Sequence, residues 1–431
     1  MKQSNPDRTI APEFREISDI PFLHPEQKEL NNGIPLYTIH AGTEDVCKID
    51  FIFDAGLWYE RHELNALLSN LMLNEGTTRL SASNLAETFD FHGAYLQLST
   101  DQHYSYLSVI TLNRHLSKII ETLASIIHEA SFPQHEFESL ILKKKNKFLV
   151  EAEKVKVISQ KRFTEVLFGK EHPYALTAWP DDYDKVNLED LKEFVQKHYK
   201  AERCRIIASG IIRPELYTLL NKHFGSNDWK SKTLLPEPEF EIHPSKQHFH
   251  LFPKEEALQS ALRVGCHAVN KLHPDYQGLL ILNTILGGYF GSRLMSNIRE
   301  DKGYTYGIYS MIISLKKAGY FFITSEVGKD SCQAALDEIQ FELKRLRTEP
   351  VPADELNTVR SYMLGEMLRE FDGPFAQAAS FRALLEYDLN YDFYRDFIHT
   401  IKNITAEQLM DLSNRYFKEE NIYEVVAGSK N

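Results

Sequence analysis

Two periods of apolar and polar residues run along the chain, and together they predict a mixed α/β protein. Stretches with a period of two, rich in β-branched and aromatic residues, predict strands. Longer stretches with apolar residues three or four apart predict helices. In the first half, strands are expected at 34–40, 48–55, 94–98 and 104–112. Helices are expected at 113–128 and 134–168.

The second half shows the same two periods. The strand at 104–112 follows the one at 94–98 directly, which favours antiparallel pairing because a parallel pair needs a long crossover. In the second half, strands are expected at 249–252, 260–268, 305–315 and 320–327. Helices are expected near 276–286, 331–348 and 353–370.

One unit of helix, turn and strand occurs twice. Residues 191–210 and 409–428 both predict an amphipathic helix, a polar turn and a strand that ends in small residues, 218 positions apart (409 − 191). Pro133 and Pro352, which each open a helix, lie 219 positions apart (352 − 133). Two matches in the same order indicate duplicated domains. We expect these domains at 1–229 and 244–431, joined by a solvated, proline-containing linker at 230–243.

Composition and charge narrow the possible partners. The hydrophobic content of 43% and the aromatic content of 12% are typical of a packed globular protein. A net charge of −12 disfavours nucleic acid or an anionic membrane as the main partner. No apolar run approaches the ~20 residues that span a bilayer. The N-terminus lacks the apolar stretch of a signal peptide, so a cytoplasmic location is expected.

Three landmarks along the chain resemble one family of enzymes. They are the Asn-Glu-Gly-Thr sequence at 74–77, the Gly-Lys-Glu-His-Pro sequence at 169–173, and the glycine-rich, then charged, then tyrosine-rich segment 287–310. In this order and spacing they resemble the insulinase/pitrilysin family of zinc metallopeptidases, in particular its short two-domain members, which act as dimers. The resemblance implies an α+β fold of two homologous domains, each a mostly antiparallel sheet with helices packed on one face.

The zinc motif of that family is missing here. Active members carry His-x-x-Glu-His on a helix, where both histidines bind zinc and the glutamate is the general base. Counted from Gly76-Thr77, the two histidines are replaced by Leu67 and Leu71 and the base by Asn70; the third ligand falls on Phe148. Leucine has no lone pair for a metal, and asparagine takes up no proton at neutral pH. We therefore expect no metal, no cofactor and no catalytic residue in this chain.

The second-half motif is better preserved. In the family an arginine and a tyrosine seven residues later form a substrate-holding pair, and the matching residues are Arg299 and Tyr306. The resemblance implies that Arg299 hydrogen-bonds substrate carbonyls through its permanently charged guanidinium. It implies that Tyr306 donates its hydroxyl to the substrate carbonyl or to the developing oxyanion.

The missing ligands and the retained pair favour a division of labour between two chains. We expect a non-catalytic subunit that holds unfolded peptides and completes the active site of a zinc-bearing homologous subunit, with zinc in the partner and no activity of this chain alone. A homodimer is the other possible assembly. Two alternatives stay open: a structural scaffold without a peptidase role, and an active metallopeptidase with an unrecognised metal site, for which His248 and His250 on one strand face are candidates.

Overall fold

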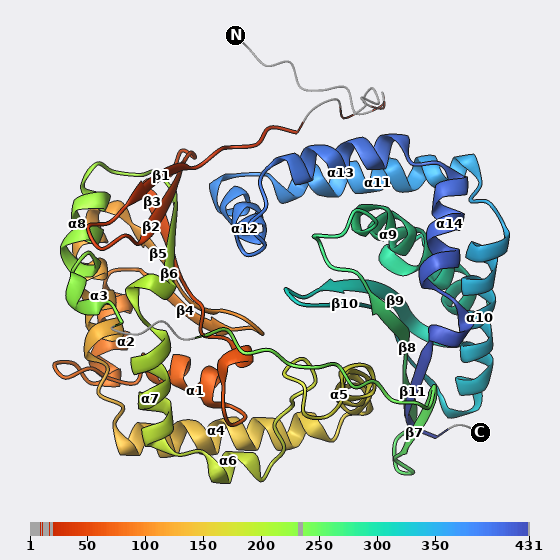
Figure 1. Cartoon of the computed structure of the whole chain (residues 1–431), viewed down its shortest axis with the longest axis horizontal. Helices are drawn as coiled ribbons and strands as arrows, with labels where there is room; N and C mark the ends of the chain where they lie inside the picture. Colours follow the sequence, from red (N-terminus) through yellow and green to blue (C-terminus); the bar gives the residue numbers. More distant parts are fainter. Residues whose placement is uncertain (1–8, 10, 12–16, 18–19, 232–235, 430–431) are drawn as a thin grey trace.

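A computed structural model describes residues 9, 11, 17, 20–231 and 236–429, and its strands form two sheets that face each other (Figure 1). The expectation about a signal peptide falls largely outside the described residues, as does the 232–235 part of the expected linker. Within the described residues, no helix is both long and apolar enough to cross a membrane.

The first sheet contains six strands in the order β1-β2-β6-β3-β5-β4. Only β2 and β6 pair in parallel; every other neighbouring pair is antiparallel. The strands are β1 (Glu26–Glu29), β2 (Pro35–His40), β3 (Val46–Phe53), β4 (Tyr95–Thr100), β5 (Ser105–Leu112) and β6 (Cys204–Gly210).

The second sheet repeats this topology. Its order is β7-β11-β8-β10-β9, and again only its first pair, β7 and β11, is parallel. With β1 set aside, the five strands correspond one to one with β2-β6-β3-β5-β4, so the expected fold class is confirmed. The strands are β7 (Phe249–Pro253), β8 (Gln259–Ala268), β9 (Thr305–Ser314), β10 (Gly319–Gly328) and β11 (Tyr423–Gly428).

Equivalent glycines end the two central strands of the repeat. Gly210 closes β6 and Gly428 closes β11, with φ angles of 109° and 128° in the left-handed region. A Cβ atom on Gly210 would lie 2.4 Å from the Val46 carbonyl oxygen, and one on Gly428 would lie 2.6 Å from the Ser260 Oγ. Both positions require glycine because the neighbouring strand leaves no space for a side chain.

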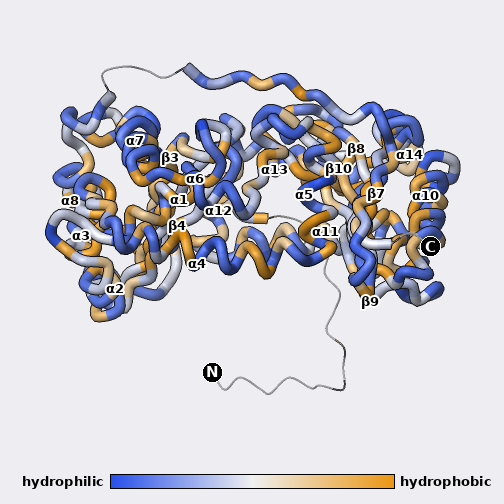
Figure 2. Tube along the Cα trace, turned by 90° about the horizontal axis from the view of Figure 1, so that it is seen from below, coloured by the Kyte–Doolittle hydropathy of each residue, from blue (hydrophilic) through white to orange (hydrophobic). Residues whose placement is uncertain are grey.

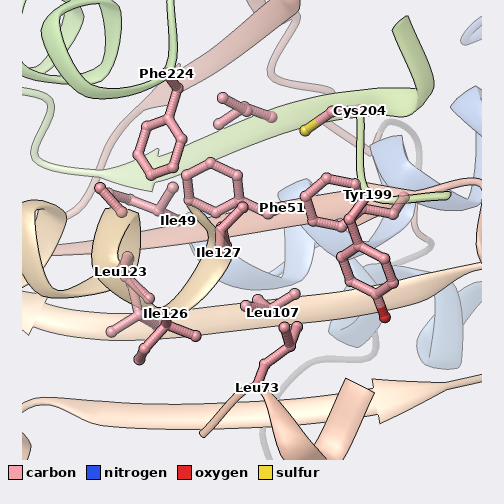
Figure 3. Close-up of a cluster of buried hydrophobic side chains, with 14 of the residues drawn as sticks. Ile49, Phe51, Leu73, Leu107, Leu123, Ile126, Ile127, Tyr199, Cys204 and Phe224 are labelled. Carbon is pink, nitrogen blue, oxygen red and sulfur yellow. The ribbon is translucent and has the colours of Figure 1, made fainter. Parts of the chain in front are cut away.

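The outer face of the first sheet packs against helices of its own half. Alternate strand residues such as Phe51 and Leu107 point into a core that Ile127 and Phe224 complete from two helices (Figure 3). Burial of this apolar surface is the main stabilising term of the half. The helices of this layer are α1 (Asn65–Met72), α2 (Ala82–Phe91), α3 (Leu116–Glu129), α4 (Gln134–Ala152), α6 (Asp182–Lys185), α7 (Leu188–His198) and α8 (Glu215–Phe224).

The second sheet is covered in the same way, with two π-helical segments, η5 and η6, among its helices. Leu262, Phe321 and Val426 of the sheet pack against Leu336 and Leu409. The segments are α9 (Tyr276–Asn283), η5 (Thr284–Gly288), η6 (Met295–Asp301), α10 (Cys332–Thr348), α11 (Ala353–Glu370), α13 (Asp392–Asn403) and α14 (Ala406–Tyr416). The expected domain boundaries near 229 and 244 stay a prediction.

The expectation of a single helix at 134–168 is wrong. The structure has two helices in this range, α4 and α5 (Val155–Phe168). Lys154 has an extended backbone, with φ −76° and ψ 128°. The second half breaks at the equivalent place, where Gly373 and Pro374 separate α11 from α12 (Pro374–Leu385). Neither glycine nor proline marks the first break, so local sequence gave no signal there.

The two helices after the breaks cross to the opposite half. Helix α12 lies on the inner face of the first sheet, where Phe381 packs with Ile39, Ile52 and Ile207. Helix α5 lies on the inner face of the second sheet, where Phe163 and its neighbours pack with Phe322 and Val425. Figure 1 shows both helices between the sheets. Each sheet is thus buried on one face by its own half and on the other by a helix from its counterpart.

Truncating Phe163 should unfold the protein more easily. The side chain is fully buried between α5 and the second sheet. Phe163→Ala should lower the free energy of unfolding by about 3–5 kcal/mol, measured by urea denaturation. Leu142→Ala on α4 is the control, since Leu142 is 60% exposed on a helix of alternating hydropathy (Figure 2). If Phe163→Ala lowered the free energy of unfolding as little as the control does, the packing of α5 on the second sheet would not be a source of stability.

Candidate functional site

Helix α1 carries the segment in which the zinc motif is missing. It begins after Leu64, whose φ of 75° is unusual for a non-glycine residue and whose side chain cannot cap a helix. Glu60 replaces the cap, because its Oε2 accepts a hydrogen bond from the Ala66 N–H at 3.0 Å. Burial raises the pKa of Glu60 to about 8. The helix start is therefore fixed by a carboxyl group outside the helix.

The side chains at the expected ligand positions of α1 hold the fold together. Leu71 packs against the first core, and Leu67 is half-buried. Asn70 is fully buried; its Nδ2 donates to the Ser99 carbonyl at 2.7 Å and to the Thr100 Oγ1 at 3.2 Å. The residue expected at the position of the base is therefore a hydrogen-bond donor that ties α1 to strand β4.

Phe148, at the expected third-ligand position, lies under a positive charge. Its ring packs 5.5 Å from the Tyr183 ring, and the Lys161 Nζ lies 4.0 Å from the centroid of the Phe148 ring. Burial lowers the pKa of Lys161 to about 8, so the amine is still largely charged at pH 7. An ammonium group this close disfavours a divalent cation beside Phe148.

The two histidines considered as an alternative metal site bind backbone instead. His248 Nδ1 lies 3.0 Å from the Ile422 carbonyl oxygen, and His250 Nε2 lies 2.9 Å from that of Gln247. Over the described ranges, no three or more His, Cys, Asp or Glu side chains are grouped so that they could hold a metal ion.

Arg299 and Tyr306 lie at the open edge of the second sheet. Tyr306 is 94% exposed on β9, the outermost strand. Arg299 lies near the end of η6, and its guanidinium stacks 4.7 Å from the centroid of the Phe290 ring. In the described part of the chain no hydrogen bond joins the two side chains. Neither side chain belongs to the core, although the Arg299 Nη1 also lies 4.0 Å from the Glu300 Oε1.

Residues that the sequence analysis missed fix this segment in place. Arg293 makes a two-pronged ion pair with Glu355 of α11, at 2.8 and 2.7 Å. Asn297 donates to Glu342 of α10 at 2.8 Å. A Cβ atom on Gly287 would lie 2.6 Å from the Ser310 Oγ, so this glycine lets η5 pack directly on β9. The sequence contained no signal for this ion pair, because neither the burial of Arg293 nor its partner can be read from the residue order.

A carboxyl pair joins the halves close to α1. The Tyr106 hydroxyl lies 2.6 Å from Asp101 Oδ2 and 2.8 Å from Glu386 Oε1, which belongs to the segment after α12. The one phenol proton can be donated to only one of the two carboxyl groups at a time. Burial raises the pKa of Glu386 above its ordinary value, although Tyr106 and Arg382 beside it act in the opposite direction.

Two models of one protein family match the chain. The model described as insulinase (peptidase family M16) matches residues 36–171, and the model described as peptidase M16 inactive domain matches residues 185–363. The description as an inactive domain therefore applies to residues 185–363, which do not include α1. The positions that the resemblance gives to the zinc ligands, on α1 and α4, lie in the first match.

Known proteins resemble the chain over most of its length. It is 25% identical over 414 residues to the uncharacterized zinc protease YmxG of Bacillus subtilis, covering 93% of this chain and 97% of that protein. It is 25% identical over 366 residues to mitochondrial-processing peptidase subunit beta of Mus musculus, covering 80% and 72%. The crystal structure of a peptidase M16 inactive domain from Pseudomonas fluorescens matches with a TM-score of 0.84 at 21% identity, covering 95% and 99%. This last match confirms the fold.

The contact between Tyr106 and Glu386, which joins the two halves, should weaken as pH rises. The folded-state pKa of Glu386 is raised above its ordinary value of 4.5, so its contribution to stability is complete below that pH and is lost as pH rises through the folded-state pKa. Glu386→Gln keeps the protonated shape. We expect the melting temperature of wild type, relative to Glu386→Gln, to fall as pH is raised from 4.5. A melting-temperature difference that stays constant with pH would contradict the raised pKa of Glu386.

Purified protein should hold no tight zinc, because Leu67, Leu71 and Phe148 offer no ligand atoms. The triple variant Leu67→His, Leu71→His, Phe148→Glu, made together with Lys161→Gln to remove the positive charge beside residue 148, should gain zinc if these three positions converge as the resemblance implies. Inductively coupled plasma mass spectrometry after dialysis measures both. One zinc per wild-type chain would contradict the first expectation, and a metal-free but folded triple variant the second.

Proposed function

Because the chain belongs to the insulinase family, peptidase family M16, we propose that it is a non-catalytic, peptide-holding subunit that completes the active site of a zinc-bearing homologue. The missing ligands of α1 carry this proposal. Leu67 and Leu71 are apolar, and Asn70 uses its amide to hold β4. Lys161 stands over Phe148 with a charge of the same sign as a metal ion.

The peptide-holding part of the proposal rests on the edge strand β9. In the described sheet, β9 pairs only with β10, so its other edge has unpaired N–H and C=O groups. An extended peptide can add to such an edge through main-chain hydrogen bonds, which give affinity without strict sequence choice. Arg299 and Tyr306 stand at this edge, with one permanent charge and one hydroxyl for the carbonyls of a peptide.

The partner in this proposal is a homologue that carries zinc. A chain that presents Arg299 and Tyr306 at a sheet edge, and whose α1 lacks the ligands of the family, would supply one part of a shared active centre. Mitochondrial-processing peptidase subunit beta, a relative, is by its name one subunit of an assembly, which supports a complex of two different chains. All four cysteines are buried thiols outside any disulfide, which suits the reducing compartment of the proposed cytoplasmic location.

The test is cleavage by the reconstituted pair. The purified chain is mixed with a zinc-bearing homologue and an unfolded peptide, and the rate is compared with that of the homologue alone. Arg299→Ala should weaken peptide binding. Tyr306→Phe, which removes one hydroxyl, should lower the rate by about 10²–10³-fold if this hydroxyl stabilises the oxyanion. Arg395→Ala is the matched control, because Arg395 pairs with Asp392 on the distant helix α13.

The outcomes separate the candidate functions. Equal rates for wild type, Arg299→Ala and Tyr306→Phe would overturn the substrate-holding role. If calorimetry also detects no peptide binding, the structural scaffold becomes the better description. Cleavage by this chain alone, abolished by a chelator, would instead point to the third alternative, an active metallopeptidase.

A further inference from the structure

Arg263 is a charged residue on the inner face of the second sheet. It lies on the central strand β8, where Thr324 of β10 and Val425 of β11 are its cross-strand partners, and it is 6% exposed. Both partners are buried, so the surroundings of Arg263 within the sheet are mostly apolar. A guanidinium at such a place normally has a carboxylate beside it.

No carboxylate pairs with Arg263 among the described residues. Its guanidinium stacks 4.2 Å from the centroid of the Phe322 ring, and its Nη2 lies 3.5 Å from the Gln160 Oε1, at the outer limit of a hydrogen bond. Its Nε is buried without a hydrogen-bond partner. Burial lowers the pKa of Arg263, and the nearby phenols of Tyr320 and Tyr309 offset part of this effect.

Arg293 shows what a buried arginine with a carboxylate partner looks like in the same chain, although its Nη1 has no hydrogen-bond partner. It is 8% exposed and makes two short hydrogen bonds to the Glu355 carboxylate. Arg263 is as deeply buried and has nothing comparable. Because a guanidinium stays protonated in a protein, this arrangement keeps an uncompensated charge in the fold, which destabilises it. Such a charge is ready to bind an anion from outside.

A ligand would approach Arg263 across β9, the strand that is proposed to hold the peptide. Its guanidinium extends from β8 over Phe322 of β10, toward the β9 edge. Tyr309 and Met311 of β9 share this face and are 41% and 44% exposed. Gln160, its one weak partner, is exposed on α5. A group that reaches in across β9 and β10 would displace one amide contact and meet the unpaired Nε.

We propose that Arg263 binds a carboxylate of the held peptide, either an acidic side chain or the C-terminal carboxylate. A planar carboxylate fits the guanidinium fork and supplies the charge that the fold lacks. The inference rests on the proposed function, since it takes the ligand to be the peptide held at β9. It adds a preference for peptides that carry a carboxylate group near the bound segment.

The test compares three labelled peptides of one otherwise neutral, unstructured sequence. The first has an internal Gln and an amidated C-terminus, the second an internal Glu and an amidated C-terminus, and the third an internal Gln and a free C-terminal carboxylate. Fluorescence anisotropy measures their dissociation constants with the full chain. The second or the third peptide should bind about tenfold more tightly than the first, which identifies the source of the carboxylate.

Two substitutions test Arg263 itself. Arg263→Met keeps the length and removes the charge; it should abolish the preference, leave binding of the neutral peptide unchanged and raise the melting temperature, because a buried unpaired charge is gone. Arg293→Met is the matched comparison for stability and should lower the melting temperature, because it leaves Glu355 unpaired. If Arg263→Met fails to fold, Arg263→Lys keeps the charge without the fork and should lose most of the preference.

Each outcome decides something different. If wild type binds none of the three peptides, the proposed function fails and this inference fails with it. If wild type binds all three equally, or if Arg263→Met retains the preference, the role of Arg263 is wrong while the proposed function stands. A lower melting temperature in Arg263→Met would show that the arginine is a packing element and would overturn the inference.

Discussion

The exchange of helices α5 and α12 is the constraint on which the rest of the structure depends. Each sheet has two apolar faces, and its own half supplies helices for only one of them. The other face is covered by the helix of the opposite half, with Phe163 on one side and Phe381 on the other. Two sheets that each need a helix from the other cannot both stay buried if the halves separate. The exchange therefore couples the stability of the two halves.

The packing of α5 and α12 on the opposite sheets also determines the surroundings of the functional groups. The Asp101–Tyr106–Glu386 cluster lies where the segment after α12 meets the first sheet, so its hydrogen bonds join the two halves. Helix α5 covers the inner face of the second sheet only in part and leaves Tyr309 and Met311 exposed beside Arg263. The half with the missing zinc motif and the half with the β9 edge are thus packed against each other through α5 and α12.

Much of the fold could be predicted from the sequence. Every strand expected from the period of two is present with its ends within two residues, because alternation reports directly which side chains face the core. The break between α4 and α5 was missed, since Glu153 and Lys154 carry no helix-breaking signal. The repeat contained it nonetheless: Val155 lies 219 positions before Pro374 (374 − 155), where glycine and proline mark the same break. Strand β1 was missed because all four of its residues are exposed.

The sequence by itself determined the chemistry that the α1 region cannot perform, since Leu67, Asn70, Leu71 and Phe148 lack the required atoms in any conformation. It also determined the duplicated pattern and the spacing of Arg299 and Tyr306. Only the tertiary structure decided which residues pair. Arg293 and Arg263 look alike in the sequence, but Glu355, 62 residues away, reaches only the first. Ion pairs and helix exchange join distant segments, and one-dimensional periodicity records which face of an element is buried without recording what covers it.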